Sequence, residues 1–137
     1  MNGESEINNK LLFFTFVAFM FIGNVFANNV NFTLEIIGIK INEGNVHVKI
    51  YSNEPDYKKD IPYISFALES VSERILHSFQ ILQGEYLIAI FYDTNNNGIL
   101  DTNLFGFPKE PVGLSNYKGG IPGGFDKQKI PINIGKI

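Results

Sequence analysis

The sequence predicts an all-β protein with one domain, either a β-sandwich or a β-barrel. Short runs of apolar and polar residues alternate with a period of two, which is the pattern of strands with one face in a core. No long stretch shows the 3.6-residue period of an amphipathic helix. Apolar residues make up 45% and aromatic residues 14% of the 137 residues, which is enough to bury a core and argues against disorder.

The first strands are expected in the first half of the chain. Residues 32–36 and 46–51 alternate on either side of a polar turn, and we expect them to pair as a hairpin. Residues 52–62 contain two prolines and mixed charge, which is typical of a loop. Alternation resumes at residues 63–68 and again at residues 75–81, so two further strands are expected there.

The most apolar strand follows. Residues 86–92 are apolar on both faces, as expected for a strand in the centre of a sheet. Residues 93–125 are rich in Asn, Gly and Pro. A connection of this length in a compact domain usually carries a function. Residues 129–134 are expected to close the chain as an edge strand, because Pro131 cannot donate to a ladder.

The N-terminal segment predicts export. Lys10 precedes a run of about a dozen apolar residues, and a site with small residues follows it and ends at Ala27. We therefore expect residues 1–27 to be a signal peptide and residues 28–137 to be a single β-sandwich domain, exported to the periplasm or the extracellular space. The run is shorter than the roughly 18 to 20 residues of a membrane-spanning helix, and no later segment is long enough, so no membrane span is expected after cleavage.

Composition excludes several classes of function. The formal net charge is −3 and no basic run exceeds Lys58-Lys59, so nucleic acid is not an expected partner. The chain has no Cys, which rules out disulfides, thiolate metal sites and a Cys nucleophile.

Residues 93–101, DTNNNGILD, form the densest group of polar side chains. Oxygen-bearing residues alternate here, Gly98 permits a turn, and a carbonyl after the turn can aim inward, which is how a loop supplies ligands to Ca²⁺. The candidate metal ligands are Asp93, Asn95, Asn97, the carbonyl of Ile99, and Asp101. Asn97-Gly98 between apolar runs is also a hairpin-turn signal, so a purely structural turn is the alternative.

The ligand set resembles only the first part of the helix-loop-helix calcium motif. That motif needs a Glu at its twelfth position, where this chain has Leu104, so a paired-helix calcium sensor is not expected. Glu110 is a candidate for the missing carboxylate. With two anionic side chains in the loop itself, the expected affinity is weak, with a Kd of roughly 0.1 to 1 mM.

Three motifs in order carry a resemblance to a known family. Gly84-Glu85-Tyr86, the loop at residues 93–101, and GFPKEPVGLSN at residues 106–116 resemble the exported bacterial family named domain of unknown function 2141. Two positions differ from its pattern: Tyr92 stands where the family usually has His, and Asn95-Asn96 replaces Glu-Asn.

The loop is also similar to calcium-binding loops in the B-type repeats of staphylococcal surface adhesins. This likeness implies a transthyretin-like or immunoglobulin-like sandwich.

We therefore expect an exported calcium-binding β-sandwich module with a structural or binding role and no enzymatic activity. Its partners would be calcium and a cell-surface or extracellular protein or glycan. Two alternatives are a small-ligand carrier and an enzyme that acts on an extracellular polymer such as a glycan. An open apolar pocket with convergent polar groups would favour the carrier, and a cleft with a perturbed carboxylate pair would favour the enzyme.

Overall fold

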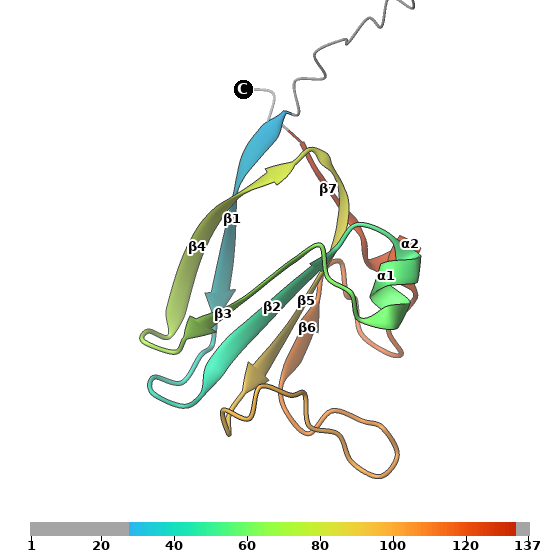
Figure 1. Ribbon diagram of the computed structural model, residues 1–137. Coiled ribbons are helices and arrows are strands. Elements are labelled where there is room, and N and C mark those ends of the chain that lie inside the picture. Colours follow the sequence, from blue (N-terminus) through green and yellow to red (C-terminus); the bar gives the residue numbers. More distant parts are fainter. Residues whose placement is uncertain (1–27, 134–137) are drawn as a thin grey trace, which may run out of the picture.

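The computed structural model describes residues 28–133, and within them strands predominate (Figure 1). The predicted signal peptide, residues 1–27, lies outside the described residues, as do residues 134–137. The strands are β1 (Asn29–Ile37), β2 (Asn45–Tyr51), β3 (Ile64–Glu69), β4 (Arg74–Leu82), β5 (Gly84–Asp93), β6 (Val112–Leu114) and β7 (Ile130–Ile132). The helices are α1 (Glu54–Lys59) and α2 (Phe125–Gln128).

The strands form two antiparallel sheets. β1 and β4 make a two-stranded sheet, and the other five strands make a sheet with the order β3-β2-β5-β6, in which β7 also pairs with β5. The all-β prediction is therefore confirmed. The prediction of a hairpin between residues 32–36 and 46–51 is wrong, because β1 pairs with β4 and β2 pairs with β3 and β5. Alternation identifies the face that a strand buries, but it does not identify the neighbouring strand.

One apolar core lies between the two sheets. Ile36 and Ile81 of the two-stranded sheet join the same buried cluster as Val48, Ile50 and Ile88 of the five-stranded sheet. β4 buries the side of the strand that the sequence predicts, with Ile75, His77, Phe79 and Ile81 turned inward. The two sheets are therefore held together by burial of apolar surface.

The central strand is β5, as predicted. Its residues 87–93 pair with β2, residues 89–91 pair also with β6, and residues 84–86 pair with β7. Leu87 is fully buried in a second cluster on the opposite face of the sheet, together with Tyr51 and Phe125. This second cluster is covered by the two helices (Figure 1).

Helix α1 lies in the segment that the sequence predicts to be a loop. Asn53 caps it, since its side chain accepts a hydrogen bond from Asp56 N at 2.9 Å, and a proline occupies the first turn. This is the usual chemistry of a helix start. The helix is too short to show a 3.6-residue period, which is why the pattern of apolar residues does not reveal it.

The long connection after β5 is interrupted by ordered structure. It contains the short strand β6 and ends where α2 begins. Between β5 and β6 the chain makes a hairpin-like excursion that projects from one end of the sheet (Figure 1), with a bridge between Thr102 and Pro108. Among the strands that the structure describes, β7 pairs with β5 alone, in agreement with the edge position predicted from Pro131.

Candidate functional site

The loop at residues 93–101 starts at the end of β5 and is anchored by a buried carboxylate. Asp93 is the last residue of β5 and is 1% exposed. The turn before β2 packs directly on its backbone, and a Cβ placed on Gly44 would lie 1.9 Å from the Asp93 carbonyl oxygen. Only glycine fits there, so the start of the loop is fixed by the neighbouring strand.

Both oxygens of Asp93 accept hydrogen bonds from the loop. Oδ1 accepts from Asn97 N at 3.1 Å, and Oδ2 accepts from Gly98 N at 2.8 Å and contacts His47 Nε2 at 3.2 Å. Burial opposes the negative charge, but the hydrogen bonds from Gly98 and Asn97 and the contact with His47 outweigh burial and hold the pKa of Asp93 below its ordinary value. Asp93 is therefore an ionised residue that shapes the turn.

The turn itself contains two residues with positive φ. Asn96 has φ 58° and Gly98 has φ 76°, a conformation that Asn and Gly tolerate best. The side chain of Asn96 is fixed by Asn45, whose Nδ2 donates to its Oδ1 at 2.8 Å. The positive φ angles thus fall at Asn96 and Gly98, so the tight turn is not formed by the adjacent pair Asn97-Gly98 alone.

Three predicted ligands meet at one point. Asn95 Nδ2 lies 2.6 Å from Asp101 Oδ2, and Asn97 Nδ2 lies 3.2 Å from the same oxygen. The amide oxygens of Asn95 and Asn97 accept hydrogen bonds from Asn97 N and Ile99 N. A cation at this point would need amide oxygens in place of amide nitrogens, so the two side chains would have to rotate when it binds.

The fourth predicted side-chain ligand, Asp93, faces the inner side of the same turn. The predicted backbone ligand is the carbonyl of Ile99, a residue that is 66% exposed. Within residues 28–133, no hydrogen bond to the Ile99 carbonyl is present. That oxygen retains its full capacity as an acceptor or ligand.

Glu110 has a different place from the other candidates. Its carboxylate is buried, with 7% of the residue exposed. Oε1 accepts from Thr94 N at 2.9 Å, and Oε2 accepts from Asp101 N at 3.2 Å. In this structure Glu110 ties the two ends of the loop together through their backbone, so its predicted part as a metal ligand stays a prediction.

No group of three or more His, Asp or Glu side chains suited to a metal occurs in the described part of the chain. The candidate site therefore depends on two carboxylates together with amide and carbonyl oxygens. These are hard oxygen ligands, of the kind that Ca²⁺ accepts and soft metals do not. The chemistry of the donors fits the predicted ion.

His47 is a site residue that the sequence does not indicate. It lies on β2, and its ring stacks on Phe91 of β5 with 4.6 Å between the ring centroids. The register of β2 with β5 pairs His47 with Phe91 and Asn45 with Asp93, which brings both side chains of β2 to the loop. Because this register cannot be inferred from the sequence pattern, the sequence does not indicate that His47 and Asn45 lie beside the loop.

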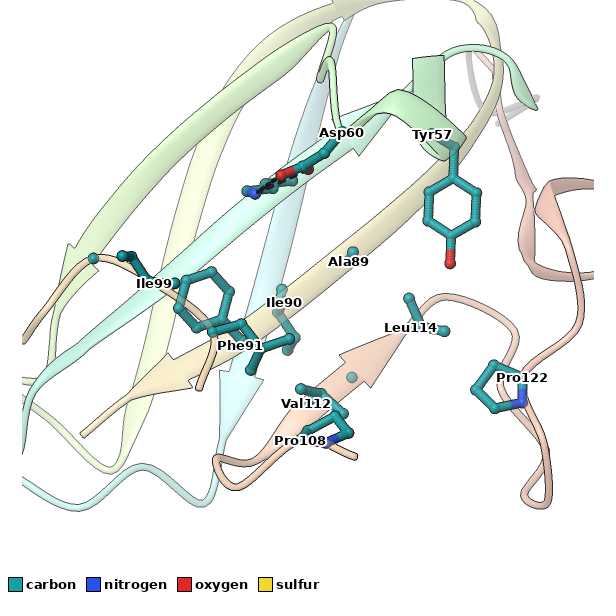
Figure 2. Close-up of a pocket in the computed structure, with 14 residues that line it drawn as sticks. Tyr57, Asp60, Ala89, Ile90, Phe91, Ile99, Pro108, Val112, Leu114 and Pro122 are labelled. Atoms are coloured by element: carbon teal, nitrogen blue, oxygen red, sulfur yellow. Dashed lines mark hydrogen bonds and ion pairs between the residues drawn. The ribbon is translucent and has the colours of Figure 1, made fainter. Parts of the chain in front are cut away.

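A pocket of about 600 Å³ lies beside the loop, on the face of the five-stranded sheet opposite the core between the sheets (Figure 2). Ile99 and Pro108 from the long connection form part of its wall, and Ala89, Phe91 and Leu114 belong to the strands beneath it. Figure 2 shows Tyr57 of α1 pointing toward this space.

The polar edge of the pocket is an ion pair. Lys49 Nζ lies 2.7 Å from Asp60 Oδ2, and Tyr51 Oη donates to Asp60 Oδ1 at 2.5 Å. Burial opposes the charge on Asp60, but these hydrogen bonds outweigh burial and lower the pKa of its carboxyl. Because Lys49 neutralises Asp60, the pocket offers hydrogen-bonding groups without a net charge.

Together, the fold and the loop define a class of small antiparallel β protein with an Asx-rich loop at the end of its central strand. The chain belongs to the family DUF2141, described as an uncharacterized protein conserved in bacteria, whose family model matches residues 34–136. The resemblance seen in the sequence is therefore confirmed. Comparisons with curated proteins and with solved structures gave no match.

Helices of the described region do not reach the length and hydropathy that a bilayer crossing requires.

Proposed function

We propose that the protein is an exported calcium-binding β-sandwich module with a structural or binding role. The observation that carries this proposal is the meeting of Asn95, Asn97 and Asp101 at a single carboxylate oxygen. A turn that served only to reverse the chain would need Asn97-Gly98 alone. It would not need a second carboxylate held against two amides.

The proposed ion is Ca²⁺ in preference to Mg²⁺. The loop offers carboxylate, amide and carbonyl oxygens around an irregular turn, and Ca²⁺ tolerates such geometry, whereas Mg²⁺ demands a near-octahedral cage. Asp93 and Asp101 bring the negative charge. Glu110 is the candidate for a further carboxylate ligand. Glu110 also holds the backbone of the loop, and His47 contacts the carboxylate of Asp93.

The finer assignment of the fold is part of the proposal. Two antiparallel sheets that share one core support a sandwich, and the similarity of the loop to adhesin repeats favours a transthyretin-like or immunoglobulin-like arrangement. Export rests on the N-terminal segment of the sequence. A partner among cell-surface proteins, extracellular proteins or glycans follows from that location.

A small-ligand carrier is the second candidate, because the pocket beside the loop has the features expected for it. Its volume of about 600 Å³ falls in the range of small-molecule sites, and a mostly apolar lining with few polar groups is typical of them. The third possibility, a polymer-degrading enzyme, gains no comparable support. Asp93 is buried and bonded by the turn, so it does not face a substrate.

Thermal unfolding with calcium and with a chelator tests the proposal. A ligand present at 100 times its Kd and bound only to the folded state stabilises by about 2.7 kcal/mol. For a domain of this size the melting temperature should rise by roughly 10 °C. Asp101→Asn keeps the shape of the side chain and removes its charge, so most of the rise should disappear.

Asp126→Asn is the matched control. Asp126 is an exposed carboxylate on α2 that pairs with Lys129, and its loss should leave the calcium response intact. If wild-type protein melts at the same temperature with calcium and with chelator, the loop is a structural turn and the proposal is wrong. If calcium stabilises all three proteins equally, the ion binds elsewhere.

A further inference from the structure

Among residues 28–133, no strand lies along one edge of β1. β1 has nine residues, and in this part of the chain it pairs with β4 only. At its two ends Gly38 N donates to Glu73 O, and Gln83 N donates to Asn28 O. Because hydrogen-bonded pairs alternate along an antiparallel ladder, the even-numbered residues of β1 bond to β4. The odd-numbered residues from Asn29 to Ile37 present their backbone groups at the free edge.

This edge lacks the usual protection against pairing. Edge strands are commonly blocked by Lys, Pro or a bulge. β1 has none of these, since its ladder with β4 runs without interruption and its only charged residue is Glu35. An edge of this length without protection favours a partner strand.

The core beside this edge is incompletely covered. The five-stranded sheet faces a sheet of only two strands, and a cavity of about 300 Å³ opens where β1 passes β6. Phe32 and Leu34 line it from one sheet, and Ile88 and Ile90 line it from the other. Gly113 helps to keep it open, because a Cβ there would lie 2.9 Å from Ile90 Cγ1. A further strand beside β1 would place apolar side chains over this opening.

The sequence of β1 complements itself in the register that its free edge requires. Thr33 is the middle residue of β1. If two copies pair antiparallel about Thr33, odd-numbered residues meet odd-numbered residues, so the free backbone groups of each copy face those of the other. Asn31 then lies opposite Glu35, and Phe32 lies opposite Leu34, so no like charges meet and apolar residues pair on the inner face.

We propose that a second copy of this chain occupies the free edge, and that the two copies form a symmetric dimer through β1. The two small sheets then join into a single four-stranded sheet across a two-fold axis, and the interface is isologous. The proposal is independent of calcium, because no residue of the loop at 93–101 takes part.

Two proline variants test this interface by sedimentation or by light scattering after size exclusion. In Thr33→Pro the missing N–H belongs to the free edge of β1, so the fold should survive, as prolines at strand edges do, and the protein should become monomeric. Ser78→Pro is the control. Ser78 lies opposite Thr33 in the ladder, so its N–H points away from β1, and this variant should remain dimeric. Circular dichroism checks that both variants are folded.

A cysteine variant tests the register. The natural chain has no Cys, and directly opposed residues of a hydrogen-bonded antiparallel pair have Cα atoms about 5.5 Å apart, which suits a disulfide. Under mild oxidation Thr33→Cys should become a covalent dimer, whereas Ser78→Cys, at a position that is also exposed, should stay largely monomeric. A monomeric wild type, a dimeric Thr33→Pro, or equal crosslinking of the two cysteine variants would each overturn the proposal.

Discussion

His47 Nε2 lies 3.2 Å from Asp93 Oδ2, so the second strand of the protein contacts the first residue of the candidate metal loop. The contact joins a half-buried ring to a buried carboxylate. It adds to the two backbone hydrogen bonds that hold Asp93 ionised. The negative charge of Asp93 thereby stabilises both the turn and the sheet.

Acid should reduce the stability of the folded protein, because it protonates Asp93. The folded-state pKa of Asp93 lies below its ordinary value of 3.8, so its contribution to stability is present above about pH 4 and is lost as the pH falls through the lower folded value. Asp93→Asn should therefore cost about 1–3 kcal/mol at neutral pH and progressively less below pH 4. Urea unfolding of both proteins between pH 7 and pH 2.5 measures the difference. A cost that does not change with pH would show that the charge is unimportant.

Gly44 should tolerate no side chain. Its φ is 72° and a Cβ would lie 1.9 Å from the Asp93 carbonyl oxygen, so Gly44→Ala must displace backbone and should cost more than about 3 kcal/mol or prevent folding. Gly38→Ala is the control, since Gly38 also has a positive φ of 81° but has open space around it. It should cost only about 1–2 kcal/mol. Equal melting temperatures for the two variants would contradict the close approach at Gly44.

Glu110 should stabilise the loop through its hydrogen bonds to the backbone N–H groups of Thr94 and Asp101. Glu110→Ala leaves the N–H groups of Thr94 and Asp101 without their acceptor. Since both hydrogen bonds are only partly buried, the cost should be about 1 kcal/mol for each bond. Hydrogen exchange should show faster exchange at these two amides and little change at the core strands. Glu110→Gln keeps one acceptor oxygen and should fall between wild type and Glu110→Ala. Unchanged exchange at both amides would refute the proposed clamp.

Export is tested by the N-terminus of the protein from its native host. Cleavage after Ala27 gives a chain that begins at Asn28, immediately before the first strand at Asn29. Mass spectrometry of the protein in the periplasmic or extracellular fraction should find this N-terminus. An intact N-terminus on protein in the cytoplasm would contradict the signal peptide.

The strands could be predicted because each buries one side of an alternating pattern. β4 and β5 appear in the structure close to their predicted ranges, as alternation and a run apolar on both faces require. The pairing of β1 with β4 could not be predicted, because alternation is the same whichever neighbour a strand has. Helix α1 was missed because six residues are too few to show a helical period, although Asn53 and Pro55 carried the capping signal.

The candidate site, too, could be predicted only where it depends on residues close together in the sequence. Asp93, Asn95, Asn97 and Asp101 could be recognised because their spacing is local and their oxygens recur at alternate positions. His47 and Asn45 come from a strand distant in sequence, and only the register between β2 and β5 brings them to the loop. Glu110 was recognised as a neighbour, but its bonds to the backbone of Thr94 and Asp101 depend on how the chain returns after its excursion.

Amide chemical shifts during a calcium titration test the central claim most directly. In ¹⁵N-labelled protein, calcium added through the expected range of roughly 0.1 to 1 mM should move the amide signals of residues 94–101, and Gly98 should be among the largest because its N–H bonds to Asp93. Asp101→Asn should abolish these shifts, and Asp126→Asn should preserve them. If calcium leaves the signals of residues 94–101 in place, or moves them no more than those of exposed carboxylates elsewhere, the loop does not bind the ion.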